Sequence, residues 1–442
     1  MDHSSPLHQV SQHLLDFFTM PAGSDALPPL SVRQLGDTIR YNILGLTDNG
    51  DLSVSANARF WQAVVAKQRR QLRSGTDDLM PENEELQSLI EQAAMWRFPF
   101  KEAKSLPIGR YTLSFQRLPI ITHVLTNVLS QAGDYGRRSK TEQSPTLSLT
   151  LQNAGVRAGQ TPQELRHYRL QVIYNIIRRL AEYSPWRLVE PEDVKKDTIR
   201  VHVELQKCTQ PELKDHVCLV SGPVVEPVQK TATKMTLDGY LELRTTHMRQ
   251  VAIHRNGIRQ SGISNMDTLM KRLGSAAVIV DLASVRHQSA VTLVRNGLGS
   301  SKGASYILYN SARLETLLRT FNDQVKAKVY DPLPPLEEID LSILEDDLDW
   351  EIIYGYLLPF PDVLESLLEQ LPQGSCGIHQ FVRYIENLAG VTSRYYRHKK
   401  VLVQRRSQLS PILYARIYLI MTVRQVLNVV LAVLGIEPVD YI

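Results

Sequence analysis

A run of 25 mostly apolar residues, 412–436, restricts the fold of this chain more than any other feature. As a helix it is long enough to span a membrane, but polar side chains interrupt it. These are Arg416, Arg424, Gln425 and Asn428. Each arginine near the centre would cost about 2.5–3.5 kcal/mol to insert into a bilayer. We therefore predict a helix buried in protein and no membrane contact.

Helix boundary signals support this interpretation. Ser410 is suited to cap the N-terminus, and Pro411 is suited to the first turn. Gly435 is placed to end the helix, with Pro438 beyond it. Such an apolar helix needs neighbours that cover it, and the sequence from about residue 296 onward has an all-helical pattern.

Charge in this helical region is segregated. Residues 336–370 contain eleven Asp or Glu and no Lys or Arg, whereas residues 383–424 contain nine Lys or Arg and one acid, Glu386. Two explanations stay open. The runs are solvated helix faces that pair with each other, or the basic run binds phosphates. Aromatic residues within the basic segment RYYRHKKVLVQRR, 394–406, favour the second, because aromatic rings stack on unpaired bases of RNA.

The segment ASYILYNSARLETLL, 304–318, carries polar side chains along one line of a predicted helix. At 100° per residue this line contains Tyr306, Tyr309, Asn310, Arg313 and Leu317. The apolar line beside it contains Ile307, Leu314 and Leu318 together with Ser311. We expect the second line to pack inward and the first to stack and form hydrogen bonds.

The first 295 residues have mixed patterns. Alternating polarity predicts strands at 110–118, 146–152, 199–205 and 216–224. Helices are expected at 119–133 and 161–184, the latter with Thr161 as N-cap and Pro162 in the first turn. Polar residues 136–145 and glycine-rich residues 293–305 are interpreted as linkers. The predicted organisation is a mixed domain at 1–138, an α/β domain at 139–295 and a helical domain at 296–442.

Independent catalytic motifs are missing from the sequence. The twelve histidines have no metal-binding spacing, and neither a phosphate-binding Gly-Lys-Ser/Thr loop nor Gly-x-Ser-x-Gly occurs. Cys208, Cys218 and Cys376 are far apart, which favours a reducing compartment. The net charge of +4 requires any nucleic-acid site to come from local clustering. We expect no cofactor and no metal.

Four segments of the C-terminal third resemble, in order, the DALR anticodon-binding domain of arginyl-tRNA synthetases. They are YILYNSARL (306–314), LLPFPDVLESLLEQL (357–371), YIENLAGVTSRYYRHKKVL (384–402) and ARIYLIMTVRQVLNVVLAVLGIEP (415–438). Upstream, RYTLSFQRLPIITHVLTNVLSQAGDYG (110–136) looks like the end of the extra N-terminal domain of those enzymes. The resemblance implies a degenerate, synthetase-like α/β part followed by an all-α DALR helical bundle.

The adenylate-binding signature of the synthetases, His-x-Gly-His, is broken at the matching positions. Glu164, Leu165, Arg166 and His167 stand there, so that only the second histidine is kept. A carboxylate repels phosphates, and Arg166 fills the space of the glycine. The Lys-Met-Ser-Lys-type loop is also missing from VQKTATKMTLDGYLEL, 228–243. The resemblance therefore implies a degenerate ATP site and no catalysis.

The chain resembles non-synthetase relatives that keep this domain, the DALR anticodon-binding domain-containing proteins, and not the enzyme itself. The resemblance implies a cytoplasmic adapter that brings arginine tRNAs to a partner methyltransferase, which makes 3-methylcytidine in the anticodon loop. Two alternatives stay open: a residual arginyl-tRNA synthetase, and a protein-interaction scaffold without RNA binding. The residues expected to bind RNA are Tyr306, Tyr309, Asn310, Arg313, Tyr395, Tyr396, Arg397, Lys399, Lys400, Arg405 and Arg406.

Overall fold

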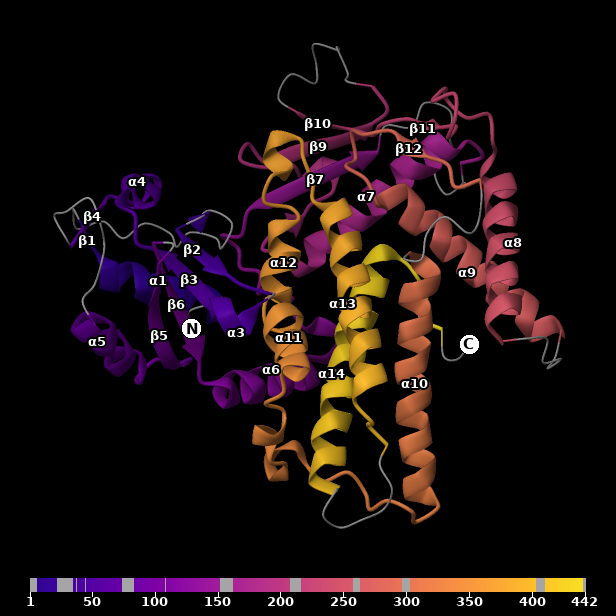
Figure 1. The fold of residues 1–442 in the computed structure, drawn as a ribbon. Helices are drawn as coiled ribbons and strands as arrows, with labels where there is room; N and C mark the ends of the chain where they lie inside the picture. The colour runs from indigo at the N-terminus through magenta and orange to yellow at the C-terminus, as the bar shows by residue number, and fades with distance from the viewer. Residues whose placement is uncertain are drawn as a thin grey trace. The chain divides into compact units, whose positions relative to one another are not determined.

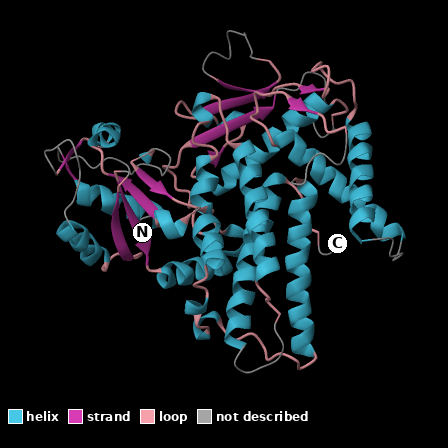
Figure 2. Cartoon of the chain, in the orientation of Figure 1, coloured by secondary structure: helices cyan, strands magenta, loops and turns pink. Residues whose placement is uncertain are grey.

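The computed structural model describes residues 6–21, 35–36, 38–43, 45–73, 83–107, 109–151, 162–206, 216–256, 263–295, 303–402 and 410–439 (Figure 1). Helices and strands both occur in the chain (Figure 2). Two compact units are each assembled from segments that lie far apart in the sequence. The first contains residues 1–130, 333–362 and 406–419, and the second contains residues 131–332, 363–405 and 420–442. The domain boundaries expected near residues 138 and 295 stay predictions.

The first unit has a four-stranded antiparallel sheet in the order β2-β3-β6-β5. Its strands are β2 (Ile39–Tyr41), β3 (Leu52–Ser55), β5 (Phe100–Leu106) and β6 (Arg110–Phe115). The further elements are α1 (Pro6–Phe18), β1 (Thr19–Pro21), α3 (Leu46–Asn49), α4 (Ala58–Lys67), β4 (Arg70–Leu72), α5 (Asn83–Ala93), α6 (Arg117–Gln131) and α11 (Asp347–Ile352). The predicted strand and helix after residue 110 are confirmed as β6 and α6, but β6 ends at Phe115 instead of residue 118, and α6 begins at Arg117 instead of residue 119.

A buried carboxylate, Asp51, joins this sheet to α11 and the π-helical turn Ile353–Leu357 within the first unit. One carboxylate oxygen accepts a hydrogen bond from Trp350 Nε1 at 2.6 Å, and the other accepts one from the Phe115 backbone N–H at 2.7 Å. The Tyr354 hydroxyl donates to the Asp51 carbonyl. Burial raises the pKa of Asp51, whereas the hydrogen bonds that Trp350 and Phe115 donate to its carboxylate lower that pKa, because they stabilise the charged form.

The α/β part of the second unit has a parallel sheet in the order β10-β9-β7-β8. Its elements are β7 (Thr146–Leu151), α7 (Leu165–Tyr183), β8 (Arg187–Leu188), β9 (Ile199–Glu204), β10 (Val217–Val220), α8 (Leu237–Asn256) and α9 (Ile263–Ala283). A short parallel pair is formed by β11 (Val224–Val225) and β12 (Val291–Thr292). Because parallel strands need a crossover, α7 connects β7 to β8. The predicted strand–helix–strand order is confirmed.

Two boundaries in the second unit also differ from those that the sequence predicts. Helix α7 begins at Leu165 with Glu164 as N-cap, and Thr161 lies outside the described residues. The Leu237 N–H donates to the Gln163 carbonyl, and Glu164 pairs with Thr236, so these residues are held extended. The strand expected at 216–224 is divided into β10 and β11. This break lies at the turn that contains Gly222.

Arg169 of α7 is fully buried, and its guanidinium donates hydrogen bonds to backbone carbonyls. Its Nη1 donates to the carbonyls of Gly222 and Ser289, both at 2.7 Å. Its Nη2 donates to the Arg286 carbonyl at 3.1 Å, and its Nε donates to the Leu282 carbonyl at 3.3 Å. The Arg169 guanidinium therefore connects α7 to the segment that contains Gly222 and to the segment that follows α9.

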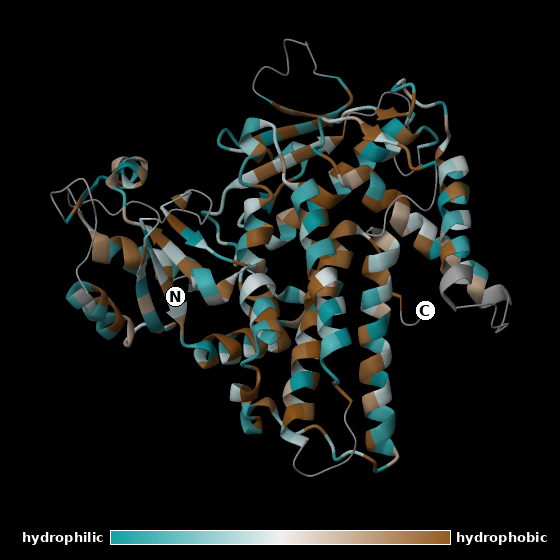
Figure 3. Ribbon diagram, viewed as in Figure 1, coloured by the Kyte–Doolittle hydropathy of each residue, from teal (hydrophilic) through white to brown (hydrophobic). Residues whose placement is uncertain are grey.

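Every described element after residue 303 is helical, as predicted. The long helices are α10 (Ala304–Lys326), α13 (Ile378–His398) and α14 (Ser410–Leu434), and α12 (Phe360–Ser366) is shorter. Hydrophobic and hydrophilic segments alternate along the long helices (Figure 3). Among the described residues α14 is the helix long and apolar enough to span a membrane, but 72% of its most apolar window is buried in the protein. Gly435 follows it with φ +74°, the left-handed conformation expected of a helix stop.

Candidate nucleic-acid interface

Arg313 of α10 stacks on Tyr396 of α13. Its guanidinium carbon lies 3.3 Å from the centre of the Tyr396 ring and 5.9 Å from the centre of the Tyr309 ring. All three side chains are half-buried. Guanidinium stacks favourably on an aromatic face while the donors at its edge stay available for hydrogen bonds. The structure thus brings together three of the residues that the sequence selected, from two helices about 80 residues apart in the chain.

The charge of Arg313 is not neutralised by the acid closest to it along α10. Glu315 lies on another side of the helix, where it pairs with Arg424 at 2.5 Å and with Arg319 at 4.0 Å. No ion pair among the described residues includes Arg313. The stack is therefore a cation held in a fixed position, which is suited to an anionic or aromatic ligand.

Two residues of the predicted interface lie in the interior instead. Asn310 is 1% exposed, and its side chain donates to the Tyr306 carbonyl at 2.8 Å. Tyr395 is fully buried. The prediction that these two side chains contact RNA directly is therefore not supported. Leu317, on the same predicted line, is also buried, because the inward face of α10 is wider than one line of side chains.

The remaining basic residues lie at the C-terminal end of α13. Arg397 and Lys400 are exposed, and Lys399 is half-buried at the helix C-cap. Cations in the last turn are favourable there because the helix dipole is negative at its C-terminus. Tyr306 is half-buried on α10. Arg405 and Arg406 lie outside the described residues.

Residues of the acidic and basic runs form ion pairs with other segments of the described chain. Asp347 pairs with Arg117 at 3.0 Å within the first unit, and Glu365 pairs with Arg138 at 2.8 Å within the second. The pair formed by Arg424 reaches α10. These contacts favour neither of the two sequence explanations by themselves.

The four residues that were matched to the adenylate-binding signature lie at the N-terminus of α7. The Glu164 carboxylate accepts a hydrogen bond from Arg166 Nε at 2.7 Å and lies 3.5 Å from His167 Nδ1. A helix N-terminus attracts anions, but the Glu164 side chain forms no hydrogen bond with the first N–H groups of α7. A phosphate bound at this helix end would be repelled by the neighbouring carboxylate. The geometry gives a physical reason for the expected loss of ATP binding.

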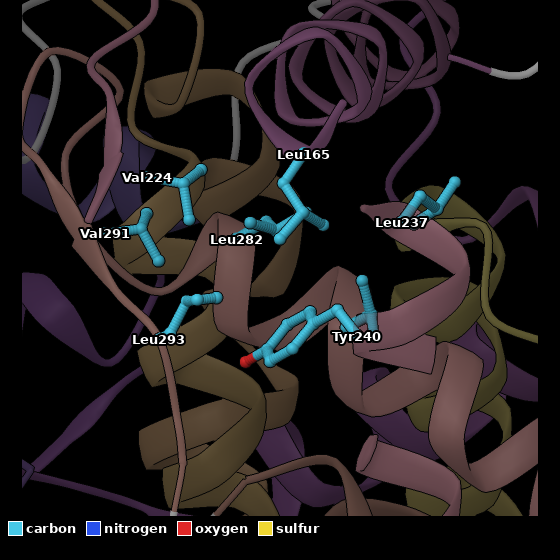
Figure 4. Close-up of a cluster of buried hydrophobic side chains, with 8 residues drawn as sticks. Leu165, Val224, Leu237, Tyr240, Leu282, Val291 and Leu293 are labelled. Atoms are coloured by element: carbon cyan, nitrogen blue, oxygen red, sulfur yellow. The ribbon is translucent and has the colours of Figure 1, made fainter. Parts of the chain in front are cut away.

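Apolar side chains fill the space below this helix end (Figure 4). The cluster contains Leu165, Val224, Leu237, Tyr240, Val278, Leu282, Val291 and Leu293. Figure 4 shows Leu165 and Leu282 directed toward each other. Its edge is polar: the Tyr240 hydroxyl donates to Asp281 at 2.6 Å, and Arg244 pairs with Asp281 at 3.0 Å. Within the described part of the chain, no group of three or more His, Cys, Asp or Glu could hold a metal ion.

Sequence reasoning missed one polar feature of α13. Arg383, Asn387, Gly390, Arg394 and Arg397 follow one another at intervals of four, three, four and three residues. This spacing places them on one side of a helix. Four of the five are exposed, and Gly390 is intermediate. The spacing of three and four residues is visible in the sequence, but the prediction considered only the C-terminal end of this helix, which contains Tyr395 and Tyr396.

Comparison with known proteins defines the class of the C-terminal region. Residues 307–442 match the family model of the DALR anticodon binding domain. The arginyl-tRNA synthetase of Thermus thermophilus has a similar fold over 99% of both chains, with a TM-score of 0.61 and 11% identity. The expected fold class, a synthetase-like α/β part followed by a helical DALR domain, is confirmed.

Individual relatives of known name give more information than the domain match. The DALR anticodon-binding domain-containing protein 3 of Danio rerio is 27% identical over 232 residues, which are 50% of this chain and 41% of that protein. An arginine–tRNA ligase of Frankia alni is 29% identical over 185 residues, which are 38% of this chain and 31% of the ligase. The matches thus span less than half the length of these curated relatives. The resemblance to DALR anticodon-binding domain-containing protein 3 is confirmed.

Proposed function

We propose that this chain is a tRNA-binding adapter that holds an anticodon loop on its DALR domain and presents arginine tRNAs to a methyltransferase that forms 3-methylcytidine. The domain match and the relatives named for that domain support tRNA binding. The choice of arginine tRNA is supported by the similarity to arginine–tRNA ligases. The methyltransferase partner follows only from the motif resemblance. We expect the adapter to act in the cytoplasm.

The stack of Arg313 on Tyr396 is the observation that carries the proposal. It lies within the matched domain and combines a cation with two aromatic rings at a half-buried position. Single-stranded RNA is recognised in this way, by cations on phosphates and by rings against bases. Each stacked base contributes about 1–3 kcal/mol to binding.

A residual synthetase activity is not favoured. The Glu164 carboxylate lies at the helix end where ATP phosphates would bind, and its partners Arg166 and His167 hold it there. We expect no arginine-dependent exchange of pyrophosphate into ATP by the purified chain. Exchange above that of a heat-inactivated sample would establish the synthetase alternative.

The test of RNA binding uses the full chain in an electrophoretic mobility assay. Purified arginine tRNA, a non-cognate tRNA and duplex RNA of similar length are the ligands. We expect binding to arginine tRNA with an affinity that falls as salt rises, because bound phosphates release counterions. If the chain binds none of the three RNAs at low salt, the protein-interaction scaffold without RNA binding is the alternative that remains.

A matched pair of variants connects binding to the stack. Tyr396→Ala removes the ring and should weaken tRNA binding by about tenfold or more, whereas Tyr396→Phe keeps the ring and should bind like the wild type. Both proteins are compared at equal folded concentration, determined by circular dichroism. Equal affinities of the Ala and Phe variants would remove Tyr396 from the interface.

The partner is tested by reconstitution. A 3-methylcytidine methyltransferase is assayed on arginine tRNA and on a second substrate tRNA, with and without this chain. The proposal predicts that the chain increases methylation of arginine tRNA only. Equal rates with and without the chain would contradict the adapter role while leaving RNA binding intact.

A further inference from the structure

The side of α13 that carries Arg383, Asn387, Gly390, Arg394 and Arg397 is here called the α13 stripe. Only Arg397 of this stripe was expected to bind RNA, and the other four residues have no assigned role. Its residues span about 21 Å at 1.5 Å per residue. Three of them are arginines, and none has a large apolar side chain. Glu386 is the one acid of α13 and is half-buried beside the stripe. The surface is therefore positive and polar along its length.

Gly390 lies in the middle of the stripe, in the interior of a 21-residue helix. Glycine weakens a helix at such a position relative to alanine. A Cβ atom built on Gly390 meets nothing within 4 Å, so packing within the described chain does not require a glycine. Gly274 of α9 is a contrast, since a Cβ there would lie 2.9 Å from Thr245 Cα on the neighbouring helix α8. A bare helix backbone on an open surface suits the close approach of another molecule.

The positive surface continues beyond the N-terminal end of the stripe. Arg286 is exposed on the segment between α9 and β12. Burial lowers the pKa of His379, and the charges of Arg286 and Arg383 lower it further. Helix α13 contacts α9, and Arg286 lies three residues after the end of α9. His379 is one turn before Arg383 on the same side of α13. At the other end, Arg397 is the residue after Tyr396.

We propose that the α13 stripe and Arg286 form a second contact with the bound RNA, in which phosphates meet the arginines and the sugar–phosphate backbone approaches Gly390. This proposal rests on the function proposed above. A protein partner is less suited, because the stripe has no large apolar side chain to fill the core of such an interface. Asn387 can exchange hydrogen bonds with a 2′-hydroxyl group. An RNA that follows the whole stripe extends about 21 Å along α13, away from the stack of Arg313 on Tyr396.

The test compares two RNAs on the full chain: an intact arginine tRNA and a single-stranded oligonucleotide of the anticodon-loop sequence. Arg286→Ala combined with Arg383→Ala should weaken binding of intact tRNA and lower its salt slope by roughly two units. Binding of the oligonucleotide should stay unchanged, because it does not reach this end. Lys271→Ala, which removes an exposed cation of α9, is the matched control and should change neither.

Gly390→Ala provides a second variant whose two effects have opposite signs. Alanine should raise the melting temperature by about 1–4 °C through helix propensity. It should weaken binding of intact tRNA about fivefold, the loss of one contact of hydrogen-bond strength. A more stable variant with undiminished affinity would overturn the proposal for Gly390.

The outcomes separate the two proposals. Wild-type binding to tRNA together with an unchanged Arg286→Ala/Arg383→Ala variant overturns the second contact and leaves the proposed function intact. A wild-type chain that binds neither RNA contradicts the proposed function, and the second contact with it. Equal weakening on both RNAs also overturns the extended contact, because it places these arginines at the loop.

Discussion

Replacement of Arg169 by methionine is expected to loosen the α/β part of the second unit. Methionine keeps an apolar stem and removes the guanidinium that donates to the carbonyls of Gly222, Ser289, Arg286 and Leu282. Gly222 and Leu282 are buried, so their carbonyls would lack a partner, whereas the two exposed residues can turn to water. Each buried carbonyl without a partner costs about 1–3 kcal/mol.

One term opposes this loss. Burial lowers the pKa of Arg169 to about 10, which means that the folded chain holds this charge at a cost. The methionine variant is relieved of that cost, and the net loss expected is about 2–4 kcal/mol. Arg169→Lys keeps the charge but has all its hydrogen-bond donors on one atom, so its free energy of unfolding should lie between those of the wild type and the methionine variant.

Hydrogen exchange measured by mass spectrometry is the appropriate assay, because a chain with two compact units need not unfold in one step. The Gly222 N–H donates to the His287 carbonyl, and the Val291 N–H donates to the Pro223 carbonyl. Both amides should exchange about 30- to 700-fold faster in the methionine variant, which corresponds to 2–4 kcal/mol. Protection that stays within threefold of the wild type would refute the reasoning.

Three further predictions concern stability. Tyr395→Ala should cost about 3–5 kcal/mol in urea unfolding, because the ring is fully buried, and retention of wild-type stability would contradict that burial. Gly435→Ala should lower the melting temperature, since φ is +74° and a Cβ would collide with the Arg179 guanidinium; an unchanged value would contradict the left-handed stop. Burial and the charge of Arg97 lower the pKa of His123 to about 4, whereas this pKa is about 6.5 in the unfolded chain. Stability should therefore fall as pH drops from 6.5 to 4, because in this range only the unfolded chain binds a proton at His123. His123→Gln should flatten that part of the stability–pH curve, and an identical slope would contradict it.

Local patterns in the sequence were sufficient for the elements whose boundaries depend on local chemistry. Gly435 ends α14 because glycine adopts a left-handed conformation, and β6 alternates as a half-buried strand. The start of α7 could not be predicted in this way. It is decided by the pairing of Glu164 with Thr236, which lies 72 residues further along the chain. Thr161 and Pro162 are good signals for a helix start, but this long-range pairing overrides them.

The candidate interface was predictable in part. The contact of Arg313 with Tyr396 joins two segments that the motifs had already selected. Asn310 was assigned to the wrong environment, since a helical wheel does not show how wide the buried face is when helices cover it from several sides. Nothing in the local sequence indicates the role of Arg169, because the carbonyls that it contacts lie 53 to 120 residues away in the chain. Only the carbonyls gathered from distant segments reveal its role.

A double-mutant cycle on Arg313 and Tyr396 tests the central claim most directly. Arg313→Ala, Tyr396→Ala and the double variant are compared with the wild type for affinity to arginine tRNA at several salt concentrations, at equal folded concentration. If the stacked pair binds RNA as one unit, each single change should weaken binding about tenfold or more, and the double variant should be little worse than either. The change at Arg313 should also lower the salt slope by roughly one unit. Unchanged affinity in all three variants, with a lower melting temperature, would mean that the stack only packs α10 against α13.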